Sequence, residues 1–357
     1  MQTIKLRNKT LQVPIIQGGM GVGVSLGNLA GHVAKCGGMG VISTAHTGYR
    51  CDDFWQNFLE DNLTEIKNEI QKAKEIAGGN GMVGINVMVA LRYYDQMVKA
   101  AIEGGADAII SGAGIPLELP AIVGDADIAI APIVSSGKSA RVICQSWKKK
   151  HDRLPDFIVV EGSQAGGHLG FPMEELSENR EQTLEEIFQD VQTVVKTFEE
   201  KYNVKIPVFV AGGVYTGYDV KKFTDMGAAG AQIATRFIAT HECDASLAYK
   251  ERYPNVKPED IVLIKSTVGM PGRALRSPFV ERLLRGEKEK ITRCLVCLRP
   301  CDPKVAAFCI TTALTEAAKG NWEDGLFFCG SNGYRMKEIV HVKDIIDEIM
   351  TEYQSGE

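Results

Sequence analysis

The sequence lacks the features that mark secreted, membrane-spanning and nucleic-acid-binding proteins. Residues 1–10 (MQTIKLRNKT) contain no apolar core of a signal peptide, and no apolar run approaches the length of a membrane span. The formal net charge is −5 over 357 residues, with acids and bases interspersed, so no surface for nucleic acid or a membrane is indicated. Nine cysteines without a secretion signal favour free thiols in a reducing compartment. We therefore expect a soluble, cytoplasmic protein with no nucleic-acid or membrane partner.

What the sequence does contain is a series of short apolar runs, most of them ending in glycine or small polar residues. Runs of four to eight aliphatic residues are typical of strands that are buried on both faces. The eight runs are 13–17, 40–43, 83–87, 108–111, 128–134, 157–161, 207–211 and 231–235.

Helical patterns lie between these runs. Apolar residues repeat at steps of three and four over 59–77 and 184–198, and shorter helices fit 95–103, 138–149 and 218–226. Eight strands alternating with helices indicate a parallel α/β sheet, which closes as a barrel or stays open and doubly wound. Glycine at nearly every strand end favours the barrel, because barrel ligands gather at that face. We predict a (β/α)₈ TIM barrel over residues 1–245.

Residues 246–357 break the alternation. Proline and glycine density over 257–275 predicts an irregular lid, and 294–315 carries a cysteine cluster that leads into a helix. Residues 321–334 are glycine-rich, and 342–353 has the pattern of a final amphipathic helix. We expect this added helical and irregular segment to pack on the barrel.

Two glycine-rich strand ends have the positions of a phosphate site. In such barrels the loops after strands seven and eight commonly bind phosphate, and these would be 207–214 (PVFVAGGV) and 230–236 (GAQIATR). Gly212 and Gly213 can offer bare backbone N–H groups to an anion, while Thr235 and Arg236 add a hydroxyl and a charge. A plain turn is the alternative for one such loop, but two in these positions favour phosphate.

Other strand ends suggest a flat ligand and a catalytic group. The loop 18–23 (GGMGVG) is bare enough for a planar ring to lie against it, and Asn86 could bond the ring's edge or simply cap a turn. The segment 161–170 (EGSQAGGHLG) holds His168 among glycines at the end of strand six. Imidazole suits acid–base work near neutral pH, so we favour catalysis over a histidine in a turn. His46, after strand two, could also line the pocket.

The chain resembles one family through five segments that occur in the family's order along residues 13–246. These segments are PIIQGGMG, GINV, EGSQAGGHLG, PVFVAGGV and QIATRFIATHE. The chain is similar to the nitronate monooxygenases, formerly the 2-nitropropane dioxygenases, and to the related flavin-dependent enoyl-acyl carrier protein reductases. The resemblance implies a TIM barrel that holds FMN, with the histidine of the AGGH segment facing the flavin.

Residue by residue, the resemblance assigns one catalytic group, His168, and a set of cofactor contacts. Gly167, with Gly162 and Gly166, would keep the backbone clear beneath the flavin ring. The chain departs from the family's usual residues at Gly19, Gln164 and Ala234, which leaves the substrate open. The implied FMN contacts are Gln17, Gly18, Met20, Asn86, Gly167, Gly212, Gly213, Gln232, Ile233, Ala234 and Thr235.

Three functions follow from this resemblance. The first is oxidation of alkyl nitronates with O₂ to carbonyl compounds and nitrite. The second is reduction of an enoyl-acyl carrier protein or enoyl-CoA by NAD(P)H. The third is a non-catalytic flavin sensor, against which His168 argues because a sensor needs no acid–base group on the flavin. No G-x-G-x-x-G follows a strand, so no dedicated nicotinamide domain is visible, and this favours the monooxygenase. The substrate is then a small or acyl-chain molecule, and a homodimer is left open.

The cysteines Cys294, Cys297, Cys301 and Cys309 have the spacing C-x₂-C-x₃-C-x₇-C. Four thiolates could hold zinc or an iron–sulfur cluster. Because no standard ferredoxin or zinc-ribbon spacing matches, we favour reduced, partly buried thiols and expect no metal.

Overall fold

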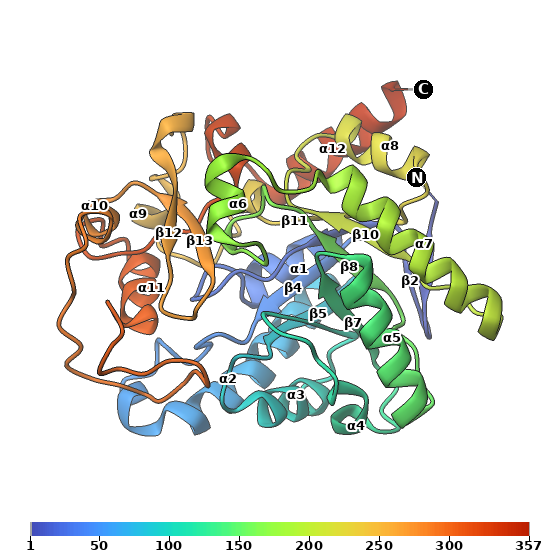
Figure 1. Cartoon of the computed structure of the whole chain (residues 1–357), viewed down its shortest axis with the longest axis horizontal. Helices are drawn as coiled ribbons and strands as arrows, with labels where there is room; N and C mark the ends of the chain where they lie inside the picture. Colours follow the sequence, from blue (N-terminus) through green and yellow to red (C-terminus); the bar gives the residue numbers. More distant parts are fainter. Residues whose placement is uncertain (1, 357) are drawn as a thin grey trace.

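The computed structural model describes residues 2–356, and a closed barrel of eight parallel strands lies at its centre (Figure 1). Neighbouring strands pair in chain order, and the last strand, β11, pairs with the first, β3. The prediction of a (β/α)₈ barrel is confirmed, and each predicted apolar run contains or overlaps one strand. The barrel strands are β3 (Ile15–Gln17), β4 (Met39–Ser43), β5 (Met82–Met88), β6 (Ala108–Gly112), β7 (Ala129–Val134), β8 (Ile158–Glu161), β10 (Val208–Ala211) and β11 (Gly230–Ile233).

Alternation along each strand separates the barrel interior from the layer beneath the helices. Phe157 and Val159 belong to the interior cluster, whereas Ile158 and Val160 pack outward against the helices. The antiparallel hairpin of β1 (Ile4–Leu6) and β2 (Lys9–Leu11) adds Leu6 and Leu11 to the interior cluster. The interior is therefore a packed core, and side chains at the carboxyl ends of the strands form its top layer.

The helices of the outer ring follow the strands. The predicted stripes over 59–77 and 184–198 lie in α2 and α7 and supply buried residues to the outward cluster. The segments α1 and α4 are helices that the sequence did not predict. The ring contains α1 (Gly27–Lys35), α2 (Phe54–Ala77), α3 (Tyr94–Glu103), α4 (Leu119–Val123), α5 (Gly137–His151), α7 (Leu184–Tyr202) and α8 (Gly217–Asp225).

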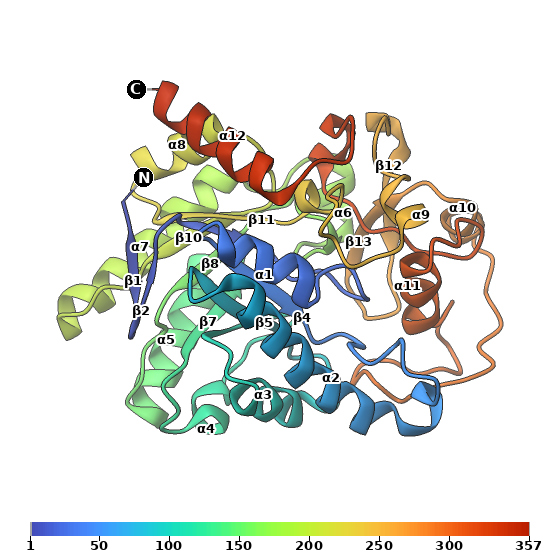
Figure 2. The same cartoon turned by 180° about the vertical axis from the view of Figure 1, so that it is seen from behind.

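The final helix α12 (Val342–Ser355) returns to the barrel and packs against α8 and α1, where an eighth outer helix belongs (Figure 2). Just before it, Val340 N donates to Ala239 O at 3.1 Å, and Thr240 forms a parallel bridge with Val340. The chain therefore leaves the barrel after β11 and comes back to the same place. The division of the chain into residues 1–245 and 246–357 stays a prediction.

The segment between these two points builds a cover over one side of the barrel mouth. Its strands β12 (Ile261–Lys265) and β13 (Pro271–Leu275) form an antiparallel hairpin, and β13 also pairs with β9 (Gly167–His168). Most of the segment 257–275, which the sequence predicted to be irregular, therefore forms a regular hairpin. Its proline and glycine serve the hairpin, since Gly269 has a φ of +82° in the turn and Pro271 begins β13.

Short helices complete the cover and the loops around the barrel mouth. No helix within residues 2–356 is both long and apolar enough to cross a membrane. The remaining elements are α6 (Met173–Glu178), η1 (Thr235–Phe237), α9 (Leu247–Lys250), η2 (Pro258–Asp260), α10 (Pro278–Leu284), α11 (Ile310–Ala318) and η3 (Ser331–Arg335).

Candidate active site

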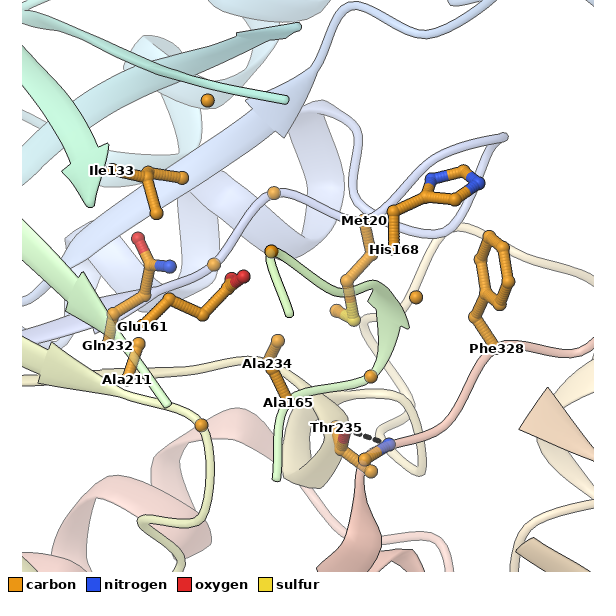
Figure 3. Close-up of a pocket in the computed structure, with 18 of the residues that line it drawn as sticks. Met20, Ile133, Glu161, Ala165, His168, Ala211, Gln232, Ala234, Thr235 and Phe328 are labelled. Atoms are coloured by element: carbon orange, nitrogen blue, oxygen red, sulfur yellow. Dashed lines mark hydrogen bonds between the residues drawn. The ribbon is translucent and has the colours of Figure 1, made fainter. Parts of the chain in front are cut away.

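A cavity of about 620 Å³ opens at the carboxyl ends of the barrel strands. Its floor is the top layer of the barrel, because each floor residue continues the inward-facing alternation of its strand. Asn86 comes from β5, Glu161 from β8, Ala211 from β10 and Gln232 from β11. Figure 3 shows Ile133, Glu161, Ala211 and Gln232 around this floor.

The structure brings nearly all of the predicted site residues together at this cavity. They come from five of the barrel strands and their loops, so the fold assembles what the sequence keeps far apart. The predicted residues that line the cavity are Gly18, Met20, Asn86, Gly167, His168, Gly212, Gly213, Gln232, Ile233, Ala234 and Thr235.

Gln17 is the one predicted contact that does not line the cavity. Its side chain is fully buried under the floor, where Nε2 donates to Gly18 O and Oε1 accepts from Val41 N at 3.1 Å. Backbone groups thus occupy both ends of the amide. The structure places Gln17 beneath the site, where it supports the loop that begins at Gly18.

Bare backbone lines the end of the cavity that the sequence assigned to phosphate. Gly212 and Gly213 have φ values of +82° and +111°, a conformation that favours glycine. A Cβ on Gly212 would lie 2.5 Å from Gly162 O, so no larger residue fits there without movement. The covering segment closes this end. Gly330 N donates to Thr235 Oγ1 at 2.9 Å (the dashed line in Figure 3), and Asn332 Nδ2 donates to Gly213 O at 2.7 Å.

Two arginines add positive charge beside this glycine-rich end. Arg236 lines the cavity, and its guanidinium donates to Tyr215 O at 2.8 Å and to the Glu348 carboxylate of α12. The Arg236 and Arg335 guanidinium carbons lie 4.8 and 4.4 Å from the centre of the Tyr215 ring. The sequence predicted Arg236 here, whereas nothing in the sequence pointed to Tyr215 or Arg335.

His168 is held between the barrel and the covering segment. Its Nε2 shares a 2.8 Å hydrogen bond with Ser266 Oγ, and its ring meets Phe328 edge-on at 5.1 Å between centroids. Its backbone pairs with Gly272 of β13. Burial lowers the pKa of His168 to about 4, so the imidazole is neutral at pH 7. Sequence reasoning missed Ser266 and Phe328, which are remote in the chain and follow no motif.

Glu161 is a further ionisable side chain that the sequence did not single out. It ends β8 on the cavity floor, and Figure 3 shows its carboxyl directed into the cavity. Burial raises the pKa of this carboxyl to about 7. The cavity therefore holds a carboxyl and an imidazole whose pKa values are shifted in opposite directions.

His46 and the cysteine cluster lie outside the cavity. His46 packs against Phe54 and Phe58, and its Nε2 shares a 2.8 Å hydrogen bond with Thr311 Oγ1. The same hydroxyl lies 3.3 Å from Cys297 Sγ. All nine cysteines are free thiols, and within residues 2–356 no three His, Cys, Asp or Glu side chains are placed to hold a metal ion.

The residues of the cavity fit a flavin mononucleotide. The volume is within the range of roughly 300–1,000 Å³ that is usual for small-molecule sites. One end offers glycine backbone, the Thr235 hydroxyl and nearby arginine, as a phosphate requires. The floor offers the Asn86 and Gln232 amides to a polar ring edge.

Comparisons with known proteins agree with this geometry. Residues 3–352 match the family model described as nitronate monooxygenase. The chain is 25% identical over 283 residues to the (3aS,4S,5R,7aS)-5-hydroxy-7a-methyl-1-oxo-octahydro-1H-indene-4-carboxyl-CoA dehydrogenase of Mycobacterium tuberculosis, covering 78% of this chain and 68% of that protein. It is 24% identical over 308 residues to a probable nitronate monooxygenase of Staphylococcus aureus strain Newman, covering 78% and 79%.

Two solved structures share the fold over nearly their whole length. FabK from Thermotoga maritima has a TM-score of 0.74 at 25% identity, covering 97% of this chain and 94% of that one. Nitroalkane oxidase from Streptomyces ansochromogenes has a TM-score of 0.73 at 19% identity, covering 97% and 96%. Because the family match spans nearly all of the sequence, the chain belongs to the nitronate monooxygenase family and is an FMN-dependent oxidoreductase.

Proposed function

We propose that this protein oxidises alkyl nitronates with O₂ to carbonyl compounds and nitrite at the barrel cavity. The observation that carries the proposal is His168, a partly buried imidazole that is neutral at pH 7, at the edge of a cavity whose other end suits phosphate. The relative in Staphylococcus aureus, named a probable nitronate monooxygenase, supports it. FMN, when bound, supplies the redox chemistry.

The chain's own residues would hold the cofactor and manage one proton. Gly212, Gly213 and Thr235 would hold the phosphate, and Asn86 and Gln232 would bond the ring edge. The neutral imidazole of His168 can accept a proton from the carbon of a nitroalkane, or hold a nitronate that is already ionised. The hydrogen bond to Ser266 Oγ fixes the ring for this task.

Reduction of an enoyl thioester with NAD(P)H is the second candidate. The cavity has apolar walls at Ile133, Phe171, Met270 and Leu314, which suit an acyl chain. The carboxyl-CoA dehydrogenase from Mycobacterium tuberculosis supports a thioester substrate. Protonation of a substrate carbon needs an acid, and a neutral imidazole such as that of His168 is a weak one. This difference favours the nitronate as substrate.

Anaerobic mixing of the FMN-loaded protein with propionate-3-nitronate, NADPH or NADH tests the proposal. Bleaching of the flavin absorbance by the nitronate alone is the expected result. Bleaching by a nicotinamide nucleotide but not by the nitronate would establish the reductase instead. A colourless protein that fails to bind added FMN would contradict both functions. A cytoplasmic location and a homodimer stay predictions.

A further inference from the structure

We propose that the Glu161 carboxyl, in its protonated form, donates a hydrogen bond to the FMN bound over the cavity floor. The proposal rests on the proposed function in one respect, that the cavity holds FMN. It adds a positioning residue that neither the sequence motifs nor the comparisons assign.

The position of Glu161 follows from strand alternation. Phe157 and Val159 fill the barrel interior below it, so the third inward residue of this strand must enter the layer on which a ligand rests. An apolar residue would fit this layer as well as its neighbours Ile133 and Ala211 do. Burying a carboxyl in this layer costs free energy unless another group forms a hydrogen bond with it.

The Glu161 carboxyl has no hydrogen-bond or ion-pair partner in the part of the chain that the structure describes. Among residues 2–356, no side chain or backbone group forms a hydrogen bond or ion pair with it, and its open side faces the cavity. A carboxyl without a partner is least costly when it keeps its proton, and a protonated carboxyl is a hydrogen-bond donor. The group that completes its bonding must therefore come from the ligand and must accept a hydrogen bond.

The surroundings contain no charge that would force the carboxyl to ionise. Ile133 and Val134 flank it from β7, Ala211 from the end of β10 and Gly212 from the loop that follows, and Gln232 comes from β11, all of them uncharged. The loop after β8 adds the uncharged Gln164 and Ala165. The other ionisable side chains around the cavity are His168, Glu175, Tyr215, Arg236, Tyr249 and Cys329.

Arg236 is the one arginine or lysine among the cavity-lining residues, and it is already paired with Glu348 of α12. His168 is neutral at pH 7. The pKa of Glu161 near 7 has burial as its cause. Above that pH the carboxyl becomes an anion beneath an anionic ligand and can no longer donate, so FMN should bind more weakly.

The dissociation constant of FMN, measured by fluorescence quenching from pH 6 to pH 9, tests this inference. In the wild-type protein the constant should rise at least about tenfold, because most molecules then carry an ionised Glu161. In Glu161→Gln, which keeps a donor of the same size but cannot ionise, the rise should be absent. Glu174→Gln removes a carboxyl from α6 outside the cavity and should behave as the wild type does.

A second measurement uses only the wild-type protein. If FMN prefers the protonated carboxyl, binding at pH 7.5 draws a proton onto the protein, and calorimetry in buffers of different ionisation enthalpy reports that uptake. Net uptake of part of a proton is expected. Wild-type protein that binds FMN without proton uptake, or with the pH dependence of Glu161→Gln, would overturn this inference alone. Failure of the wild type to bind FMN at any pH would overturn the proposed function.

Discussion

The Ser266 hydroxyl lies 2.8 Å from Nε2 of His168, although 98 positions separate the two residues in the chain. Ser266 sits in the turn between β12 and β13, and His168 belongs to β9, which pairs with β13. The covering hairpin thus fixes both the backbone and the ring of the proposed catalytic residue. Activity should therefore depend on a segment that lies outside the barrel.

Replacing Ser266 with Ala should lower kcat about fivefold and leave the FMN dissociation constant unchanged. One neutral hydrogen bond contributes about 1 kcal/mol, which corresponds to that factor in rate. Ser266→Thr keeps the hydroxyl and should restore most of the rate. Thr267→Val alters the next residue, whose hydroxyl has no partner, and serves as the control. Unchanged kcat together with an unchanged acid limb of the pH profile would show that the hydrogen bond is structural only.

Replacing His168 with Ala should leave FMN bound, because the glycine-rich loops hold the cofactor. Turnover of a neutral nitroalkane should fall by about 10²–10⁴, the usual contribution of a positioned acid or base. The loss should be smaller for a pre-ionised nitronate, since no proton has to be removed. Steady-state rates on both substrates, with the visible spectrum as a check on bound FMN, make the comparison. Equal rates for variant and wild type on both substrates would assign His168 no catalytic role.

Gly212→Ala should weaken FMN binding at least about tenfold. The residue has a φ of +82°, which costs a side chain roughly 1–3 kcal/mol, and the new methyl would meet Gly162 O. Gly124→Ala is the matched control, because Gly124 also has a positive φ but has no neighbour within 4 Å of an added Cβ. That control should lose some stability through its positive φ and keep its FMN affinity. Equal affinities in both variants would argue against the phosphate end.

His46 should make the protein less stable in acid. Burial lowers its pKa to about 4 in the folded state, below the ordinary 6.5, so the unfolded state binds more protons between these values. Stability is therefore complete above pH 6.5 and is lost as the pH falls towards 4. Between pH 7.5 and pH 5 the wild type should lose about 2 kcal/mol more unfolding free energy than His46→Asn. Urea titrations at the two pH values measure this, and parallel losses would show that His46 does not set the acid limit.

The cluster of Cys294, Cys297, Cys301 and Cys309 should contain little metal. Iron and zinc should both be substoichiometric in protein prepared without air, as measured by elemental analysis. Enough iron for one iron–sulfur cluster per chain would instead indicate an electron-transfer flavoprotein.

The barrel could be predicted because its signals are local. Each strand is a short apolar run that ends in glycine, and helices such as α7 show their buried face in the spacing of residues within one segment. Helix α1 also has a buried face (Leu29, Ala30, Val33 and Ala34), but it is short, and Gly27 and Gly31 lower its helix propensity. Those glycines serve packing, because a Cβ on Gly31 would lie 2.7 Å from Cβ of Ile76 in α2.

The site could be predicted only where its residues lie in a recognisable sequence motif. His168 and the glycines at 212 and 213 belong to recognisable segments. No local pattern reports that Phe328 and Asn332 line the cavity or that Ser266 bonds to His168. Glu161 also lies in such a segment, but it ends an apolar run buried on both faces, and no local pattern shows that its side chain enters the cavity.

The anchoring of the covering segment at one point of the barrel has an evolutionary consequence. Its two ends meet where Thr240 bridges Val340 and His341 Nδ1 lies 2.8 Å from Glu242 Oε1. A descendant gene could therefore exchange most of the sequence between these residues, or lengthen it, without changing the path of any barrel strand. The covering segment can diversify as a replaceable module, while the path of the barrel strands is inherited unchanged. Relatives that act on different compounds are the outcome that such an arrangement permits.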